Sequence, residues 1–201
     1  MLGERLHDYK GQTPLVLAIP RGAVPMAKIV AEALGGDFDV VLVRKLGAPG
    51  NPEFAIGAVE ESGWAYLSPW AASAGADADY IERAKQRELD TIRRRRAQYS
   101  PLRPARNPED RIVIVLDDGL ATGATMIAAL HALRAQAPRK LLCAVPVAPP
   151  DTVEKVAAYC DEVICLYATE DFRAVGQFYA DFRQVEDEEV VEILREKPAA
   201  P

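Results

Sequence analysis

The sequence of 201 residues lacks several features that mark specialised classes of protein. Its apolar runs are too short to cross a bilayer, and Met1–His7 contains no signal-peptide core. The net charge is -6, so a basic excess that would favour general binding to nucleic acid or anionic membranes is missing. There is no internal repeat, and low-complexity sequence is confined to the Pro/Ala tail. These absences lead us to expect a soluble, cytoplasmic protein that binds neither nucleic acid nor membrane.

Cysteine is scarce, with only Cys143, Cys160 and Cys165 in the chain. An odd number of cysteines without metal-ligand spacing argues against both a disulfide framework and a zinc site. Two of the three lie in apolar, strand-like runs. We therefore expect reduced residues of the core.

What is present is the composition of an ordinary globular domain, with 49% hydrophobic and 27% charged residues. Strand-like and helix-like segments alternate, which predicts an α/β fold with a parallel sheet. Asp151 is the expected N-cap of one helix, and a Pro- and Arg-rich connector leads to Asp110. The predicted strands are 15–19, 40–43, 111–116, 140–147 and 163–167, with a hairpin of 54–59 and 64–67; the predicted helices are 24–34, 78–99, a segment from 126 to 133, and 151–159.

The most informative segment is Asp117–Thr125, which follows the apolar strand 111–116 and precedes a helix. Ligands of open α/β sheets bind at this edge. The turn Ala121–Thr125 can direct backbone N–H groups and two hydroxyls at one anion, with the positive end of the helix dipole behind them. Asp117 and Asp118 suit hydrogen bonds from vicinal hydroxyls, with a divalent cation nearby. Together these features predict a site for a ribose 5-phosphate.

Asp117–Thr125 also resembles the phosphoribosyl pyrophosphate (PRPP) signature of the type I phosphoribosyltransferases. The resemblance implies a Rossmann-like parallel sheet with flanking helices, in one domain over residues 1–201. Its core would be about 12–167, and a small C-terminal hood about 168–201, to which residues 1–11 can add. Asp117 and Asp118 would hold the ribose hydroxyls and Mg²⁺, directly or through water. The 5′-phosphate would be held by Ala121, Thr122, Gly123, Ala124 and Thr125.

A second anion site is predicted at Arg21 and Gly22, where the first strand ends. Glycine permits a close approach of the backbone, and arginine can bind a phosphate with two parallel hydrogen bonds. The segment resembles the pyrophosphate loop of the type I enzymes, which often carries Arg-Gly. It is predicted to receive the leaving pyrophosphate.

The basic pair Arg44 and Lys45 ends the second predicted strand and precedes the bridge Leu46–Glu53. The pair resembles that of the adenine and orotate phosphoribosyltransferases, and the bridge resembles the flexible lid of the type I enzymes. Cations that arrive with a closing lid stabilise the developing charge of pyrophosphate and exclude water. We expect catalytic roles for both residues, although Pro49 and Pro52 stiffen the bridge.

The segment Glu170–Arg183 is similar, with an offset of one residue, to the hood of the 6-oxopurine enzymes. That similarity makes Phe172 a stacking platform for a flat acceptor, with Val175 and Gly176 lining the pocket. The same role is open to three other aromatics, which can equally be core residues: Phe178, Tyr179 and Phe182.

Two departures from the 6-oxopurine pattern disfavour hypoxanthine and guanine as acceptors. Ala121 stands where those enzymes have an aspartate, and the strand 163–167 lacks their lysine. The segment Val43–Val59 best matches bacterial predicted phosphoribosyltransferases whose acceptor is undefined. The sequence therefore indicates the donor and leaves the acceptor open.

We expect a Mg²⁺-dependent enzyme that transfers 5-phosphoribosyl from PRPP to a nitrogen nucleophile, a nucleobase or another planar amine, and releases pyrophosphate. Lys45, Arg44, Asp117 and Asp118 are its expected catalytic residues. A homodimer is expected from the family. One alternative is a non-catalytic PRPP or nucleotide sensor, because the fold of the family also serves in regulators. Lys45 and the lid discriminate between the two, since a pure sensor has less need of a leaving-group clamp. A receiver-type phosphoacceptor is weaker, because receivers carry their acid pair after the first strand.

The run Arg93–Arg96 lies on the predicted helix 78–99, whose apolar stripe includes Ile81, Ala84, Leu89 and Ile92. Asp90 can pair with Arg93 and Arg94 at helical spacing. On an acidic protein, a solvated helix face or a subunit contact is favoured over RNA binding.

Overall fold

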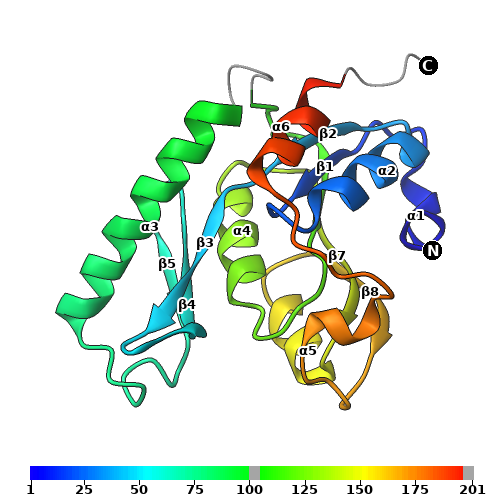
Figure 1. The fold of residues 1–201 in the computed structure, drawn as a ribbon. Helices are drawn as coiled ribbons and strands as arrows, with labels where there is room; N and C mark the ends of the chain where they lie inside the picture. Colours follow the sequence, from blue (N-terminus) through cyan, green and yellow to red (C-terminus); the bar gives the residue numbers. More distant parts are fainter. Residues whose placement is uncertain (100–104, 197–201) are drawn as a thin grey trace.

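The computed structural model describes residues 1–99 and 105–196; the end of the predicted hood and part of the Pro- and Arg-rich connector lie outside these ranges. A five-stranded parallel sheet forms the centre, in the order β2-β1-β6-β7-β8 (Figure 1). The predicted fold class is confirmed. The strands are β1 (Leu15–Ala18), β2 (Asp37–Val40), β6 (Ile112–Leu116), β7 (Lys140–Ala148) and β8 (Glu162–Ala168).

Helices cover both faces of this sheet, which explains why its strands are continuous apolar runs. Alternate residues of β6 point to opposite faces. Ile112, Ile114 and Leu116 pack with α1 (Leu2–Arg5), η1 (His7–Tyr9), α2 (Val24–Leu34) and α6 (Asp187–Arg195). Val113 and Val115 pack with α4 (Ala124–Arg134) and α5 (Pro150–Ala157).

A second, smaller unit holds three antiparallel strands and one long helix (Figure 1). The strands are β3 (Val43–Ala48), β4 (Asn51–Glu60) and β5 (Ala65–Leu67), and the helix is α3 (Ala78–Tyr99). Trp64, in the turn between β4 and β5, stacks on His131 of α4, with ring centroids 3.6 Å apart and planes 7° from parallel. This stack attaches the smaller unit to the central layer.

Three element predictions were wrong, and two of them concern where an element begins or ends. The run 40–43 was expected to be one strand, but β2 ends at Val40 and β3 begins at Val43, in a different sheet. Val41 and Leu42 between them are buried, so hydrophobicity alone could not reveal the break. Asp151 was expected to be an N-cap, but Pro149 holds that position and Asp151 lies in the first turn of α5.

The predicted lid, Leu46–Glu53, was expected to be a loop and instead forms the turn end of a β-hairpin. β3 pairs with β4 across a turn at Gly50, which has a φ of 72°. The backbone of Pro52 lies so close to Gly47 that a Cβ there would come within 2.5 Å of the Pro52 carbonyl oxygen. Lys45 therefore lies on strand β3 of the hairpin and not in a loop.

The topology brings two loops together at one edge of the central sheet. From β1 the chain crosses to β2 on one side, whereas from β6 it crosses to β7 on the other. Ligands of open α/β sheets bind where the strand order reverses in this way. Ala18 and Leu116 are register partners, so the loops that follow β1 and β6 begin side by side. The C-terminal chain passes this edge through η2 (Val175–Phe178) before α6.

Among the described residues, no helix combines the length and the apolar character that crossing a bilayer requires.

Candidate active site

The two adjacent carboxylates, Asp117 and Asp118, directly follow β6 and are both half-buried. The backbone N–H of Asp118 donates a hydrogen bond to the Asp117 carboxylate over 2.9 Å. Burial raises the pKa of Asp117 well above its usual range, and the nearby charge of Asp118 raises it further. Burial also raises the pKa of Asp118. The pair therefore favours a proton, a hydroxyl donor or a cation close to it.

The donor set fits a magnesium ion that is bound together with a substrate. Within residues 1–99 and 105–196, no group of three or more His, Cys, Asp or Glu side chains is placed to hold a metal ion. Mg²⁺ is commonly held by one or two carboxylates, with substrate phosphates and water completing its shell. Asp117 and Asp118 meet that requirement.

Hydrogen bonds to neighbouring elements hold the backbone at the start of the loop Ala121–Thr125. The Thr152 hydroxyl of α5 donates to the carbonyl of Ala121 over 3.0 Å, and the N–H of Leu120 donates to the carbonyl of Val147 over 3.0 Å. Gly123 is the N-cap of α4, with a φ of 76°, and has no side chain to occupy the first-turn N–H groups. The start of α4 is therefore suited to an anion.

A cavity of about 330 Å³ joins this loop to the smaller unit. Lys45 is the one basic residue among its lining residues, and its Nζ lies 3.3 Å from the carbonyl oxygen of Glu53 and 3.4 Å from the Glu53 carboxylate. The structure thus brings Lys45 to the acid pair and the predicted phosphate loop. The cavity is lined by Asp117 to Thr125 together with Lys45, Glu53, Phe54, Ala55 and Val175.

Arg44 does not share that position, because neighbouring residues of a strand face opposite sides. Its Nε donates to the Glu88 carboxylate of α3 over 2.8 Å. It lines a different groove, of about 310 Å³, between the hairpin and α3. The catalytic role predicted for Arg44 therefore finds no support in this arrangement.

Gly22 in the loop after β1 lies against the acid pair. A Cβ built on Gly22 would come within 2.1 Å of the Asp118 Oδ2. Any other residue would push the carboxylate aside, so glycine is needed here for close approach. The neighbouring Pro20–Arg21 peptide bond is cis. The two loops predicted to bind anions are thus in direct contact.

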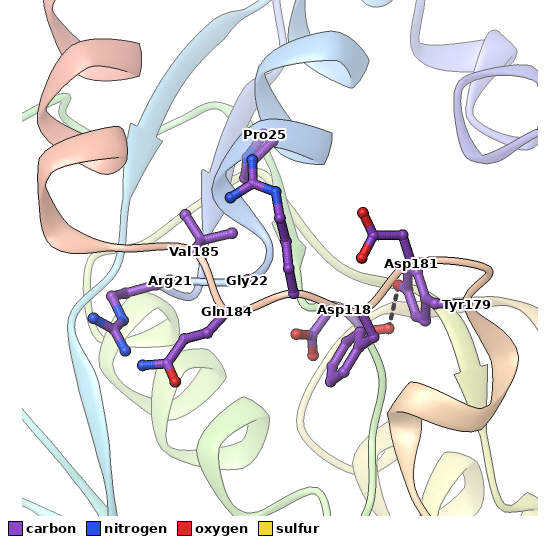
Figure 2. A pocket seen from close by; sticks show the side chains of 10 residues that line it. Arg21, Gly22, Pro25, Asp118, Tyr179, Asp181, Gln184 and Val185 are labelled. Atoms are coloured by element: carbon purple, nitrogen blue, oxygen red, sulfur yellow. Dashed lines mark hydrogen bonds between the residues drawn. The ribbon is translucent and has the colours of Figure 1, made fainter.

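A larger cavity, of about 590 Å³, opens between this contact and the C-terminal chain (Figure 2). We call residues 179–186 the strap. The Tyr179 hydroxyl of the strap donates to the carbonyl of Asp118 over 2.6 Å. Burial, together with the charges of Asp118 and Asp117, raises the pKa of Tyr179 to about 12. The cavity is lined by Arg21, Gly22, Pro25, Asp118, Tyr179, Asp181, Phe182, Arg183, Gln184 and Val185.

Comparison with known proteins identifies the family. Residues 1–183 match the model described as the phosphoribosyl transferase domain. The chain belongs to the phosphoribosyl transferase domain family. This membership favours the PRPP interpretation of the acid pair over a receiver-type phosphoacceptor.

Two relatives are similar over most of this chain. The crystal structure of TT1426 from Thermus thermophilus is 48% identical, covers 96% of this chain and 92% of its own, and superposes with a TM-score of 0.79. "Putative phosphoribosyl transferase Rv0571c" of Mycobacterium tuberculosis (strain ATCC 25618 / H37Rv) is 40% identical over 194 residues, 96% of this chain. The chain spans only 44% of the length of that curated relative.

In this phosphoribosyl transferase domain, the residues predicted to bind the acceptor are divided between different places. Phe172 packs against Phe178, with ring centroids 5.5 Å apart, and lines a third cavity, of about 390 Å³, with Ala121 and Glu170. Val175 lies over Gly119, where a Cβ would come within 2.8 Å of it. A Cβ on Gly176 would likewise come within 2.8 Å of the Phe182 ring, so Gly176 leaves room for that ring. Phe172 is thus not the aromatic side chain that meets Asp118.

Aromatic residues that do share a cavity with Asp118 are Phe54, Tyr179 and Phe182. The sequence indicated Tyr179 and Phe182 as candidates; Asp181 and Arg183 lay within the hood-like segment Glu170–Arg183 without an assigned role, and Gln184 lay just beyond it. The strap has no helical or strand periodicity, so no local pattern marked these residues. Their proximity to Arg21 is a property of the tertiary fold.

The arginine run of α3 is partly explained by ion pairs within the domain. Arg93 pairs with Asp90 over 2.8 Å, as predicted, but Arg94 donates to the Thr91 hydroxyl. Arg95 pairs with Asp187 over 3.3 Å, and Arg96 forms a salt bridge with Glu61. Half of the run therefore binds other elements of the chain and is not a solvated face.

The cysteines also lie as the sequence analysis expected. Cys143 is buried, and Cys160 and Cys165 are half-buried free thiols beside the same core. Burial raises the pKa of all three thiols, which disfavours the reactive thiolate form.

Proposed function

We propose that this domain transfers the 5-phosphoribosyl group of PRPP to a nitrogen nucleophile and releases pyrophosphate. The observation that carries the proposal is the contact of Gly22 with the Asp118 carboxylate at the point where the strand order reverses. One ligand can therefore reach the acid pair, the phosphate loop and Arg21 at the same time.

The placement of PRPP follows from the chemistry of each segment. Residues Ala121–Thr125 would bind the 5′-phosphate at the start of α4. Asp117 and Asp118 would accept hydrogen bonds from the ribose 2′- and 3′-hydroxyls. The diphosphate would extend toward Arg21 and Gly22, and Lys45 lines the adjacent cavity, which shares Asp118 with theirs.

The reaction exchanges one bond of the anomeric carbon for another. The bond to the pyrophosphate oxygen breaks, the bond to the acceptor nitrogen forms, and the acceptor loses a proton. The transition state has oxocarbenium character, as in glycoside hydrolysis. In this proposal the chain's own residues hold the reactants in line and stabilise the leaving group, without a covalent enzyme intermediate.

Asp117 and Asp118 would also hold Mg²⁺ together with oxygens of the substrate. When bound, the ion neutralises charge on the departing diphosphate. The carboxylates orient the ribose whether or not the ion contacts them directly.

The acceptor in this proposal is a planar nitrogen compound. Phe182, with half of its surface exposed in the cavity of Asp118, offers a platform for stacking. The absence of an aspartate at Ala121 continues to disfavour hypoxanthine and guanine. The dimer and the cytoplasmic location stay predictions.

A non-catalytic PRPP sensor is the alternative, and Lys45 argues against it. A sensor needs to hold PRPP but has less need of a cation that clamps the leaving group. Lys45 lies on the wall of the cavity that holds the acid pair.

The decisive experiment replaces both carboxylates, Asp117→Asn with Asp118→Asn. Calorimetry with PRPP and Mg²⁺ should then show binding weakened about 100-fold or more, because charge-assisted hydrogen bonds to the ribose and the ion are lost. The matched control, Asp8→Asn with Asp79→Asn, removes the same charge at exposed positions and should bind normally. Unchanged affinity in the double acid variant would refute the proposal.

Turnover is tested separately by incubating the wild-type domain with PRPP and a panel of purines, pyrimidines and other amines. Release of pyrophosphate with one acceptor supports the enzyme. Tight PRPP binding with no release for any member of the panel supports the sensor.

A further inference from the structure

Two arginines line the cavity of about 590 Å³, and both are held by carboxylates of one short segment. Arg21 Nη1 lies 3.1 Å from the Glu186 carboxylate and 3.8 Å from that of Asp187. Arg183 binds Glu189 through both of its terminal nitrogens, each over 2.8 Å. Residues 186–189 open α6, so we call them the acidic turn.

The acidic turn has one firmly anchored member. Asp187 accepts a hydrogen bond from the buried Tyr99 over 2.9 Å and pairs with Arg95 over 3.3 Å, in addition to Arg21. These contacts tie the start of α6 to the end of α3. Asp187 is therefore a fixed part of the structure that stands beside Arg21.

Glu186 is held much less firmly. Its side chain is 57% exposed, and its ion pair is with Arg21. Ion pairs with a solvent-exposed partner are weak, so a ligand with several negative charges can displace this carboxylate from the Arg21 side chain, which is itself 20% exposed. Glu189 is more restrained, because it also accepts a hydrogen bond from the backbone N–H of Glu186.

The ion pair of Arg21 with Glu186 lowers the affinity of Arg21 for any other anion. The guanidinium is already satisfied by a carboxylate, so an incoming phosphate gains only the difference between the two interactions. The strap also joins the acidic turn to Tyr179, which is bonded to Asp118 at the other loop. The C-terminal segment is thus attached to both predicted anion loops.

We propose that Glu186 is an internal competitor of the diphosphate for Arg21, while Asp187 positions the Arg21 side chain. This inference rests on the proposed function and adds a regulator of its diphosphate site. Binding of a diphosphate exchanges the Glu186 contact for a phosphate contact and retains the Asp187 contact.

The test measures the affinity of inorganic pyrophosphate by calorimetry for the wild type and three variants. Glu186→Gln should bind about 2- to 5-fold more tightly, the range that corresponds to a lost competitor of up to about 1 kcal/mol. Asp187→Asn should bind more weakly, because Arg21 loses its fixed partner. Thermal unfolding confirms that each variant is folded.

Glu188→Gln is the matched control, because Glu188 is exposed in the same turn and takes no part in these ion pairs. It removes the same charge from the same helix end and should bind like the wild type. An equal gain in Glu188→Gln would assign the effect to general charge and overturn the competition. Equal affinities of Glu186→Gln and wild type would overturn it as well.

The two proposals fail in different ways. If the wild-type domain binds neither pyrophosphate nor PRPP with Mg²⁺, the proposed function is wrong, and the inference falls with it. If the wild type binds PRPP and Glu186→Gln binds pyrophosphate no more tightly, only the competition is wrong.

Discussion

At the scale of single residues, Gly22 explains how two loops can serve one ligand. The space that its side chain would fill belongs to the Asp118 carboxylate. The obstacle to a larger residue is the end of a side chain that can rotate, not a rigid backbone. A substitution at this position is therefore expected to act on binding more than on folding.

Gly22→Ala should lower the affinity for PRPP at least tenfold, about 1.4 kcal/mol, because the new methyl group turns the Asp118 carboxylate away. The melting temperature should change little. Calorimetry and thermal unfolding measure the two effects. Gly3→Ala is the control: its Cβ would meet the Ala33 Cβ at an ordinary 3.6 Å, so PRPP binding should be unchanged. A Gly22→Ala variant with normal affinity would show that the contact is not needed.

The half-buried carboxylate of Asp117 is expected to lower the stability of the fold while it contributes to PRPP binding. Its pKa is raised in the folded state, so over the pH range between the unfolded and folded pKa the folded protein holds the extra proton. Its unfolding free energy must therefore fall as pH rises through the folded pKa. Asparagine cannot ionise and can still accept the hydrogen bond from the Asp118 N–H.

Asp117→Asn should consequently melt a few degrees higher than the wild type at about pH 8 while losing PRPP affinity. The gain should shrink as the pH falls toward about 4, close to the ordinary aspartate pKa, because the wild-type carboxyl is then protonated in the folded state and only partly ionised in the unfolded state. Thermal unfolding across this pH range provides the measurement. A gain that is constant with pH would contradict the electrostatic cause.

At the scale of elements, local signals predicted α2 and α3 well, whereas α1 and α6 were not predicted. α2 and α3 have the bounds expected from the sequence, and Gly35 ends α2 with a φ of 65°. The break at Val41 and Leu42 could not be predicted, because both residues are as buried as a strand would be. The lid was predicted as a loop because Pro and Gly usually interrupt strands.

Part of the candidate site could likewise be predicted from the sequence, and part could not. Asp117–Thr125 could be found from sequence because its residues are contiguous and lie between a strand and a helix. Arg44 and Lys45 looked equivalent as neighbours, and both line the groove beside α3, but of the two only Lys45 also lines the cavity of the acid pair. The roles of Arg183 and Glu186 depend on tertiary contacts that form only in the folded chain.

The Trp64 and His131 stack tests how the smaller unit is attached. The Nδ1 of His131 is one of the buried side-chain atoms of the described residues that lack a hydrogen-bond partner. His131→Ala should lower the unfolding free energy by about 1–2 kcal/mol through loss of packing. His131→Phe keeps a flat ring without the unpaired nitrogen, so it should be at least as stable as the wild type.

Urea denaturation of His131→Ala, Trp64→Ala and the double variant measures the coupling, which we expect to be about 1 kcal/mol. Trp70→Phe is the control, since Trp70 donates to the Ala55 carbonyl within the smaller unit and should show no coupling to His131. Strict additivity of Trp64→Ala and His131→Ala would mean that the stack contributes nothing to docking.

At the scale of the whole molecule, the site is assembled from segments far apart in the sequence. The loop after β1, the loop after β6 and the strap converge at one edge of the central sheet, and the hairpin adds Lys45 from the smaller unit. The protein has a net charge of -6, yet its basic residues Arg21, Lys45 and Arg183 line these cavities. The same cavities are also lined by the carboxylates Glu53, Asp117, Asp118 and Asp181, so an anionic ligand needs a cation or a proton on these acids in addition to the basic side chains.

This convergence predicts a distinctive pattern of hydrogen exchange. PRPP with Mg²⁺ should slow exchange simultaneously in residues 20–24, 117–127 and 177–187, because one ligand contacts all three segments and suppresses their local opening. α1 and α5 serve as internal references and should change little. Ribose 5-phosphate lacks the diphosphate, so it should protect residues 117–127 but leave the loop after β1 and the strap close to their free rates. Protection by PRPP of residues 117–127 alone would mean that Arg21 and the strap do not belong to the donor site, even if the acid pair does.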